Sequence, residues 1–115
     1  METEWTDQTA FDAAYVHCME QKVPAKDSRG DCVYRGPNGT KCAIGCLIPD
    51  NLYRKGMEGD SASAVVSGLG WELDLQLVDC IQEAHDNLLS QDNLSPFRNQ
   101  MKTIAGLYGL EWNHD

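Results

Sequence analysis

The segment Cys32-Val33-Tyr34-Arg35-Gly36-Pro37-Asn38-Gly39-Thr40-Lys41-Cys42-Ala43-Ile44-Gly45-Cys46 decides the predicted fold class, because strands are expected only here. Two stretches with β-branched or aromatic residues, 32–34 and 41–48, flank a turn in which Pro37 and Asn38 suit the central positions. We therefore expect one β-hairpin over about residues 31–48. Several turn lengths fit, so the register stays open, and Pro49-Asp50 ends the second strand.

Before the hairpin, apolar residues recur at three- and four-residue intervals, which predicts a helix from Gln8 to about Lys22 with Thr6 or Asp7 as its cap. Pro24 and a polar run then predict a loop. After the hairpin, residues 51–57 suit a short helical turn, and Ser61 suits the cap of a helix that reaches about Leu69.

The C-terminal half predicts a helical pair over about residues 72–109. The first helix runs from Glu72 to about Leu89 with a continuous apolar stripe. The second starts at Ser95-Pro96, with Ser95 as its cap and the proline at the first helical position, and ends near Gly109. The predicted architecture is α+β: a mostly helical single domain over residues 1–115, with one β-hairpin packed on three or four helices.

Length and composition favour one globular domain with a real core, since the chain has 115 residues, 42% hydrophobic and 23% charged. The N-terminus is acidic where a secretory signal needs positive charge, and no apolar run approaches membrane-spanning length. We expect a cytoplasmic protein without membrane association. Its five cysteines are expected to be free thiols.

Positive charge is concentrated in one window. Seven of the nine Lys and Arg residues lie between Lys22 and Lys55, where the only acids are Asp27, Asp31 and Asp50, so the window carries +4. The whole chain carries −9, and the remainder therefore carries −13. This division favours a recognition function for one part of the chain, with an acidic remainder that repels other polyanions.

A candidate anion-binding surface follows from this window. A hairpin would bring Arg35 and Lys41 together, the turn at Arg54-Lys55 could fold beside them, and Tyr34 or Tyr53 could stack on a base. The candidate binding residues are Arg29, Tyr34, Arg35, Lys41, Tyr53 and Arg54. The alternative is that these cations pair with acids of their own chain. Direct nucleic-acid binding is disfavoured by the acidic remainder.

Other groupings suggest no defined chemistry. Cys32, Cys42 and Cys46 lack the doubled close spacing of zinc sites, so packing as small core residues is favoured over a zinc site or a catalytic thiol. The Gly36-x-x-Gly39 run lacks the Walker A ending and is interpreted as a plain turn. We expect no catalytic residue, no metal and no cofactor.

The predicted helix at 72–89 carries two features of interest. His85 and Asp86 are adjacent, and because neighbouring helical residues diverge by roughly 100°, we do not expect an oriented dyad. Its carboxylates could imitate a phosphate backbone, although a solvated face is the more common reason for such a stripe. The stripe comprises Asp74, Asp79, Glu83 and Asp86.

The run Cys32-x-Tyr34-Arg35-Gly36-Pro37-x-Gly39-x-Lys41-Cys42-Ala43-Ile44-Gly45 resembles a family of small uncharacterised proteins of bacteriophages and prophage-bearing bacteria. Ile81-Gln82-x-Ala84-His85-Asp86 and Ile104-Ala105-x-x-Tyr108-Gly109-Leu110 are similar to its C-terminal half. The resemblance implies a phage or prophage context, with no activity or catalytic residue attached.

This context leads to the functional expectation. We expect a non-enzymatic phage-type accessory protein that binds and inhibits a host or defence macromolecule, as anti-CRISPR proteins do. The alternative is a protein that binds a nucleotide or another small anion through the basic hairpin, and a thiol- or zinc-based activity is a third possibility.

Overall fold

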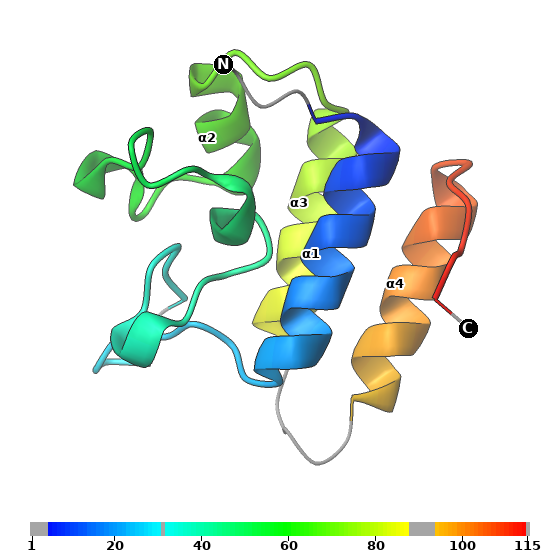
Figure 1. Cartoon of the computed structure of the whole chain (residues 1–115), viewed down its shortest axis with the longest axis horizontal. Helices are drawn as coiled ribbons and strands as arrows, with labels where there is room; N and C mark the ends of the chain where they lie inside the picture. Colours follow the sequence, from blue (N-terminus) through cyan, green and yellow to red (C-terminus); the bar gives the residue numbers. More distant parts are fainter. Residues whose placement is uncertain (1–4, 31, 88–93, 115) are drawn as a thin grey trace.

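The computed structural model describes residues 5–30, 32–87 and 94–114 of the chain, and these residues form four α-helices and three short 3-10 helices (Figure 1). The α-helices are α1 (Asp7–Gln21), α2 (Ala62–Gly68), α3 (Leu75–Asp86) and α4 (Ser95–Leu107). The 3-10 helices are η1 (Pro37–Gly39), η2 (Gly45–Leu47) and η3 (Lys55–Met57).

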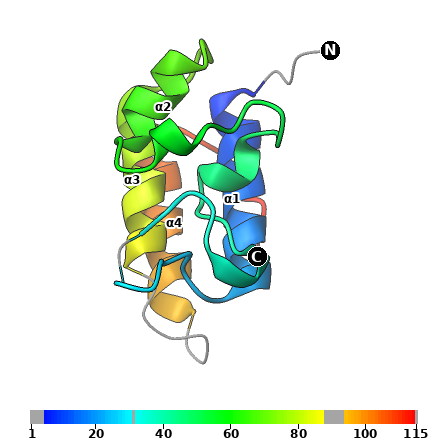
Figure 2. The same cartoon turned by 90° about the vertical axis from the view of Figure 1, so that its left-hand side faces the viewer.

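The helices α1 and α3 lie side by side at the centre of the molecule and run in the same direction (Figure 1). Helix α4 runs the opposite way beside α3, while the irregular segment between α1 and α2 covers the other side (Figures 1 and 2). This long irregular segment carries the predicted binding residues, so its own packing determines what they can do.

The core is one cluster of buried side chains drawn from all four helices and from the irregular segment. Burying a large apolar side chain contributes about 1.5–3 kcal/mol, so these contacts dominate the stability of the fold. The largest fully buried apolar side chains of this core include Phe11, Ile44, Leu77, Ile81 and Met101.

The helices agree with the sequence prediction, with small shifts at their ends. Thr6 caps α1 and Ser61 caps α2, both through hydrogen bonds from main-chain N–H groups. Helix α3 starts three residues later than predicted, because Asp74 accepts the N–H groups of the first turn. The predicted end at Leu89 lies outside the described residues. Ser95 is the first residue of α4 and not its cap.

The predicted β-hairpin at 31–48 is wrong, and with it the α+β fold class. In the described part of the chain there is no strand or sheet, and only isolated antiparallel bridges remain, Lys26 with Cys32 and Arg35 with Lys41. The second predicted strand turns into η2 instead. Its N–H groups bond within the segment, from Cys46 to the Cys42 carbonyl at 3.0 Å and from Ile48 to the Gly45 carbonyl at 3.2 Å.

Side chains take the place of the missing partner strand. The Glu58 carboxylate accepts the N–H groups of Tyr34 at 2.9 Å and Arg35 at 3.2 Å. The Gln21 amide both accepts the Lys41 N–H and donates to the Lys41 carbonyl, each at 2.9 Å. Because these bonds satisfy the main chain without a ladder, the segment folds against α1 as irregular structure.

Beyond α4 the C-terminal segment turns back alongside that helix (Figure 1), and it also forms hydrogen bonds to α1. Gln8 exchanges two hydrogen bonds with the Glu111 main chain, and Trp112 packs edge-on against Tyr15 with ring centroids 5.0 Å apart. The His114 ring bonds to Asp12 at 2.8 Å. This segment therefore closes the aromatic end of the core.

Candidate functional site

Two of the predicted binding residues, Arg35 and Lys41, lie opposite each other across an antiparallel bridge, as the turn between them predicted. The Arg35 guanidinium, however, already has partners in its own chain. It donates to Asp50 Oδ1 at 2.6 Å and to the Ile48 carbonyl at 2.7 Å, and it lies 4.7 Å from the centroid of the Tyr53 ring.

The ion pair with Arg35 stabilises the ionised form of the Asp50 carboxyl. The hydrogen bond and charge of Arg35, together with the Lys41 ammonium, lower the pKa of the Asp50 carboxyl. The Arg35 side chain is 21% exposed, and its buried Nε has no hydrogen-bond partner among the residues that the structure describes. A second anion at this guanidinium would have to compete with Asp50 for the same donors.

Both candidate tyrosines are held by hydrogen bonds within the chain. Tyr34 is buried, and its hydroxyl donates to the Asp60 carbonyl at 2.6 Å. Tyr53 donates to Glu58 Oε2 at 2.6 Å, and burial together with this bond raises the pKa of Tyr53 to about 12. Tyr53 already stacks on Arg35, and Tyr34 is only 5% exposed, which leaves too little of its ring face for a base to stack on.

The remaining predicted cations are held locally. Arg29 is exposed and forms an ion pair with Asp27 at 3.9 Å within one turn. Arg54 is exposed and folds back to the carbonyls of Asn51 and Tyr53, each at 3.2 Å. Arg35 thus lies opposite Lys41 and stacks on Tyr53, whereas Arg29 and Arg54 bond to other residues.

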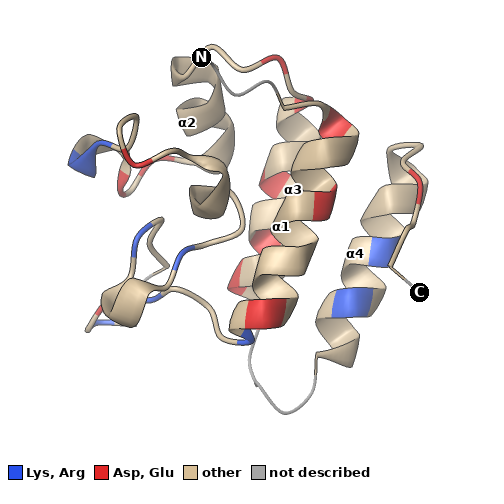
Figure 3. Ribbon diagram, in the orientation of Figure 1, with Lys and Arg blue, Asp and Glu red and all other residues tan. Residues whose placement is uncertain are grey.

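Charge remains separated at the level of elements. Lys and Arg lie on the irregular segment and on α4, whereas α1 and α3 carry mainly Asp and Glu (Figure 3). On α3, Asp79, Glu83 and Asp86 follow at intervals of four and three residues, which places them along one side of the helix. We call these three residues the α3 acidic stripe.

The carboxylates of α3 also have structural roles that the sequence did not indicate. Asp74 is the helix cap, and Asp79 Oδ1 accepts the Ser63 N–H at 2.9 Å, which ties α2 to α3. Glu83 is exposed. The stripe therefore keeps its negative charge while two of its members also bond within the protein.

The cysteines divide between core and surface. Cys18 and Cys42 are fully buried, as small core residues would be, whereas Cys32 is exposed and does not pack in the core. Burial raises the pKa of the Cys42 and Cys46 thiols to about 12. Within residues 5–30, 32–87 and 94–114, no three His, Cys, Asp or Glu side chains are placed to hold a metal ion.

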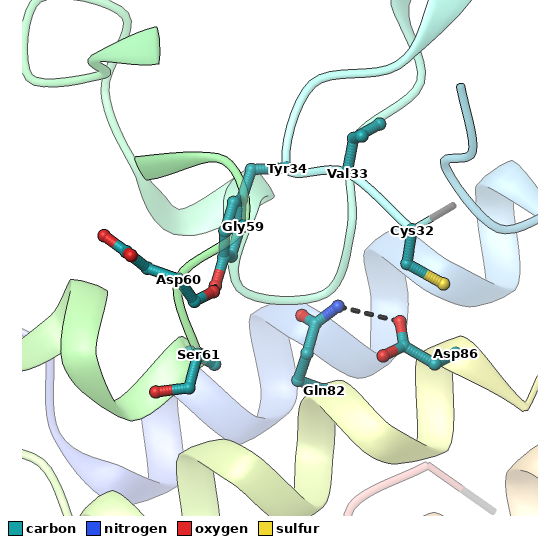
Figure 4. A pocket seen from close by; sticks show the side chains of 9 residues that line it. Cys32, Val33, Tyr34, Gly59, Asp60, Ser61, Gln82 and Asp86 are labelled. Carbon is teal, nitrogen blue, oxygen red and sulfur yellow. Dashed lines mark hydrogen bonds between the residues drawn. The ribbon is translucent and has the colours of Figure 1, made fainter. Parts of the chain in front are cut away.

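A pocket of about 200 Å³ opens where the irregular segment meets α2 and α3 (Figure 4). The Asp86 carboxylate and the Cys32 thiol face each other on one side, and the Asp60 carboxylate points away from the cavity (Figure 4). The other lining residues are Val33, Tyr34, Gly59, Ser61, Ala62 and Gln82. Drug-sized ligands occupy about 300–1,000 Å³, so this pocket suits a smaller group.

His85 and Asp86 form the oriented pair that the sequence analysis did not expect. His85 is fully buried, and its Nδ1 lies 3.1 Å from Asp86 Oδ1. The Ala25 N–H donates to His85 Nε2 at 3.3 Å, so Nε2 is unprotonated and Nδ1 carries the proton. Adjacent helical residues diverge by roughly 100°, but the Asp86 side chain lies back along α3 and so reaches the His85 ring. In this position Gln82 also donates to Asp86 at 2.9 Å.

Sequence reasoning missed Glu58 and Asp50 as residues that shape these sites. Glu58 and Asp50 bond to residues 15 to 24 positions away, and no periodicity marks them. Asp86 was considered for the acidic stripe and beside His85, but no signal in the sequence placed it in a pocket.

No protein-family model, curated protein or solved structure matches this chain. The phage resemblance therefore stays a prediction. Among the residues that the structure covers, no helix combines the length and apolar character needed to cross a membrane.

Proposed function

We propose that this chain is a non-enzymatic accessory protein of phage type that binds and inhibits a host or defence macromolecule, with the α3 acidic stripe facing the partner. The observation that carries the proposal is the charge arrangement: the chain has a net charge of −9, α1 and α3 carry mainly acidic charge (Figure 3), and Arg35 is already paired with Asp50. Such a surface attracts a basic partner and repels nucleic acid.

The acidic charge of α3 indicates which class of partner to expect. Proteins that bind nucleic acid carry basic surfaces for the phosphate backbone, and a row of carboxylates can occupy such a surface in place of the phosphates. The spacing of Asp79, Glu83 and Asp86 along one side of α3 supplies that row. A nucleic-acid-binding component of a defence system is therefore the partner class that we test first.

The test is inhibition together with binding. Bacteria that carry a CRISPR-Cas or restriction system are infected with a targeted phage, with and without this chain, and the purified effector is mixed with the chain for co-elution. We expect plaque formation to rise and the two proteins to co-elute at low salt, with weaker association at high salt. Absence of both effects across the panel of systems rejects the function.

A matched pair of variants tests the surface. Glu83→Lys reverses an exposed charge on α3, and Glu111→Lys makes the same change on the C-terminal segment. We expect Glu83→Lys to weaken inhibition at least tenfold and Glu111→Lys to leave it unchanged. Equal effects of the two variants would show that only net charge matters.

The anion-binding alternative has weaker support. Arg35 stacks on Tyr53 and lies opposite Lys41, which favours it, but Asp50 occupies the guanidinium. A nucleotide that binds the folded state raises the melting temperature by mass action. If no nucleotide of a panel raises the melting temperature, this alternative is rejected. If a nucleotide raises it and Arg35→Glu abolishes that rise, the alternative is supported.

A further inference from the structure

The pocket beside the α3 acidic stripe contains a carboxylate, Asp86, that bonds to a buried histidine. The His85 Nδ1–H points to the carboxylate, and the His85 Nε2 accepts the Ala25 N–H. Among the described residues, neither Lys nor Arg forms an ion pair with Asp86.

The carboxylate is also ionised and held in place. Burial raises the pKa of Asp86, but hydrogen bonds from His85, Cys32 and Gln82, together with the electrostatic attraction of His85, outweigh that effect and hold the pKa below its usual value. Gln82 is itself fixed, since its Oε1 accepts the Ile44 N–H at 3.3 Å. A carboxylate can accept about four hydrogen bonds, so capacity remains for a donor that enters the pocket.

The shape of the pocket limits the ligand. Tyr34 and Ala62 contribute apolar lining, the Asp86 carboxylate lies on the side of Cys32, and the Val33 side chain points away from the cavity (Figure 4). An aliphatic stem that ends in a charged group matches this combination of apolar and charged lining. The volume of about 200 Å³ admits one such side chain and is too small for a nucleotide.

We infer that this pocket binds one arginine side chain of the partner protein, with the guanidinium on Asp86 and the aliphatic stem against Tyr34 and Ala62. The inference rests on the proposed function and deepens it, because the pocket shares Asp86 with the α3 acidic stripe. Arginine is favoured over lysine since its planar fork can donate two hydrogen bonds to one carboxylate.

The test uses N-acetyl-arginine amide as the probe and the uncharged, nearly isosteric N-acetyl-citrulline amide as its control, followed by NMR of backbone amides. We expect the arginine probe at millimolar concentration to shift Val33, Gly59 and Ala62, and the citrulline probe to shift them at least tenfold less. Shifts of equal size with both probes, or none with arginine, overturn the inference.

Protein variants complete the test. Asp86→Asn keeps the side-chain shape and removes the charge, whereas Glu111→Gln removes an exposed charge on the C-terminal segment. Asp86→Asn should weaken binding of the arginine probe at least tenfold, about 1.4 kcal/mol, and Glu111→Gln should change it less than twofold. If Asp86→Asn fails to fold, Cys32→Phe, which places a ring beside Asp86 from an exposed position (Figure 4), must abolish binding.

The outcomes separate the pocket from the proposed function. If the arginine probe does not bind but Glu83→Lys still relieves inhibition of the defence system, the pocket inference fails and the function stands. If the probe binds through Asp86 while the chain inhibits no defence system, the arginine pocket stands and the proposed function fails.

Discussion

At the scale of single residues, Glu58 organises the segment that the sequence predicts as a hairpin. Its carboxylate accepts hydrogen bonds from the Tyr34 N–H, the Arg35 N–H and the Tyr53 hydroxyl. Three contacts therefore position Arg35. Its main-chain N–H bonds to Glu58, and its guanidinium pairs with Asp50 and stacks on the Tyr53 ring.

Glu58→Gln tests this role. The amide keeps one acceptor and turns an NH₂ group toward a donor, so one main-chain or hydroxyl donor loses its partner. We expect the free energy of unfolding to fall by about 1–3 kcal/mol, measured by denaturant melts. Glu72→Gln, at an exposed position, is the control and should change it by less than about 0.5 kcal/mol. A Glu58 variant as stable as this control contradicts the role.

Gly45 is required for space and not for its backbone angle. A Cβ atom at this position would lie 3.1 Å from Cys42 Sγ and in hard overlap with the Tyr34 carbonyl oxygen, which is main chain and cannot turn away. Gly45→Ala should therefore lower the free energy of unfolding by about 1–3 kcal/mol in denaturant melts.

The control for this substitution has the opposite expected sign. Gly106 lies in α4, and a Cβ there meets open space. Gly106→Ala should raise stability by up to about 1 kcal/mol, because alanine favours the helix. If both variants shift stability in the same direction, the close approach of Gly45 to Tyr34 is not what constrains that position.

At the scale of elements, the helices were predictable because their signals are local. Periodic apolar residues and the caps Thr6 and Ser61 lie within a few positions of the turns that they stabilise. The hairpin prediction failed because strands depend on a partner. Here the side chains of Glu58 and Gln21, which are distant in sequence, accept hydrogen bonds from main-chain N–H groups that a second strand would otherwise have accepted.

Helix α3 offers an element-scale test, since Asp74 Oδ1 accepts the N–H groups of Gln76 at 3.0 Å and Leu77 at 3.2 Å. Asp74→Ala should lower the free energy of unfolding by about 0.5–2 kcal/mol and speed hydrogen exchange at both amides. Asp74→Asn preserves the capping oxygen and serves as the control. Unchanged exchange in the alanine variant would show that packing alone starts the helix there.

At the scale of the whole molecule, the sequence located the basic segment and the acidic helices correctly but could not assign partners among them. The pairing of Arg35 with Asp50 and Tyr53 depends on how the irregular segment folds against α1. For the same reason the pocket at Asp86 could not be predicted, because it joins loop residues 32–34 and 59–62 to α3.

The buried thiols predict how the whole molecule responds to alkali. Burial raises the pKa of Cys42 and Cys46 from 9.0 to about 12 and that of Cys18 further still. Unfolded thiols release their protons near pH 9.0, before the folded ones do. The stabilisation is therefore complete below that pH and is lost as pH rises toward about 12, at up to about 1.4 kcal/mol per pH unit for each thiol.

Denaturant melts under reducing conditions, from about pH 8 to about pH 11, measure this slope. Cys46→Ser keeps a donor to the Ala43 carbonyl and removes one titrating thiol, so the decline should become shallower by up to about 1.4 kcal/mol per pH unit. Thr103→Ser, a change at an exposed position of α4 that involves no thiol, is the control and should leave the slope unchanged. Because the prediction depends only on burial between α1 and η2, a flat stability profile over this range would mean that solvent reaches these thiols in the folded protein.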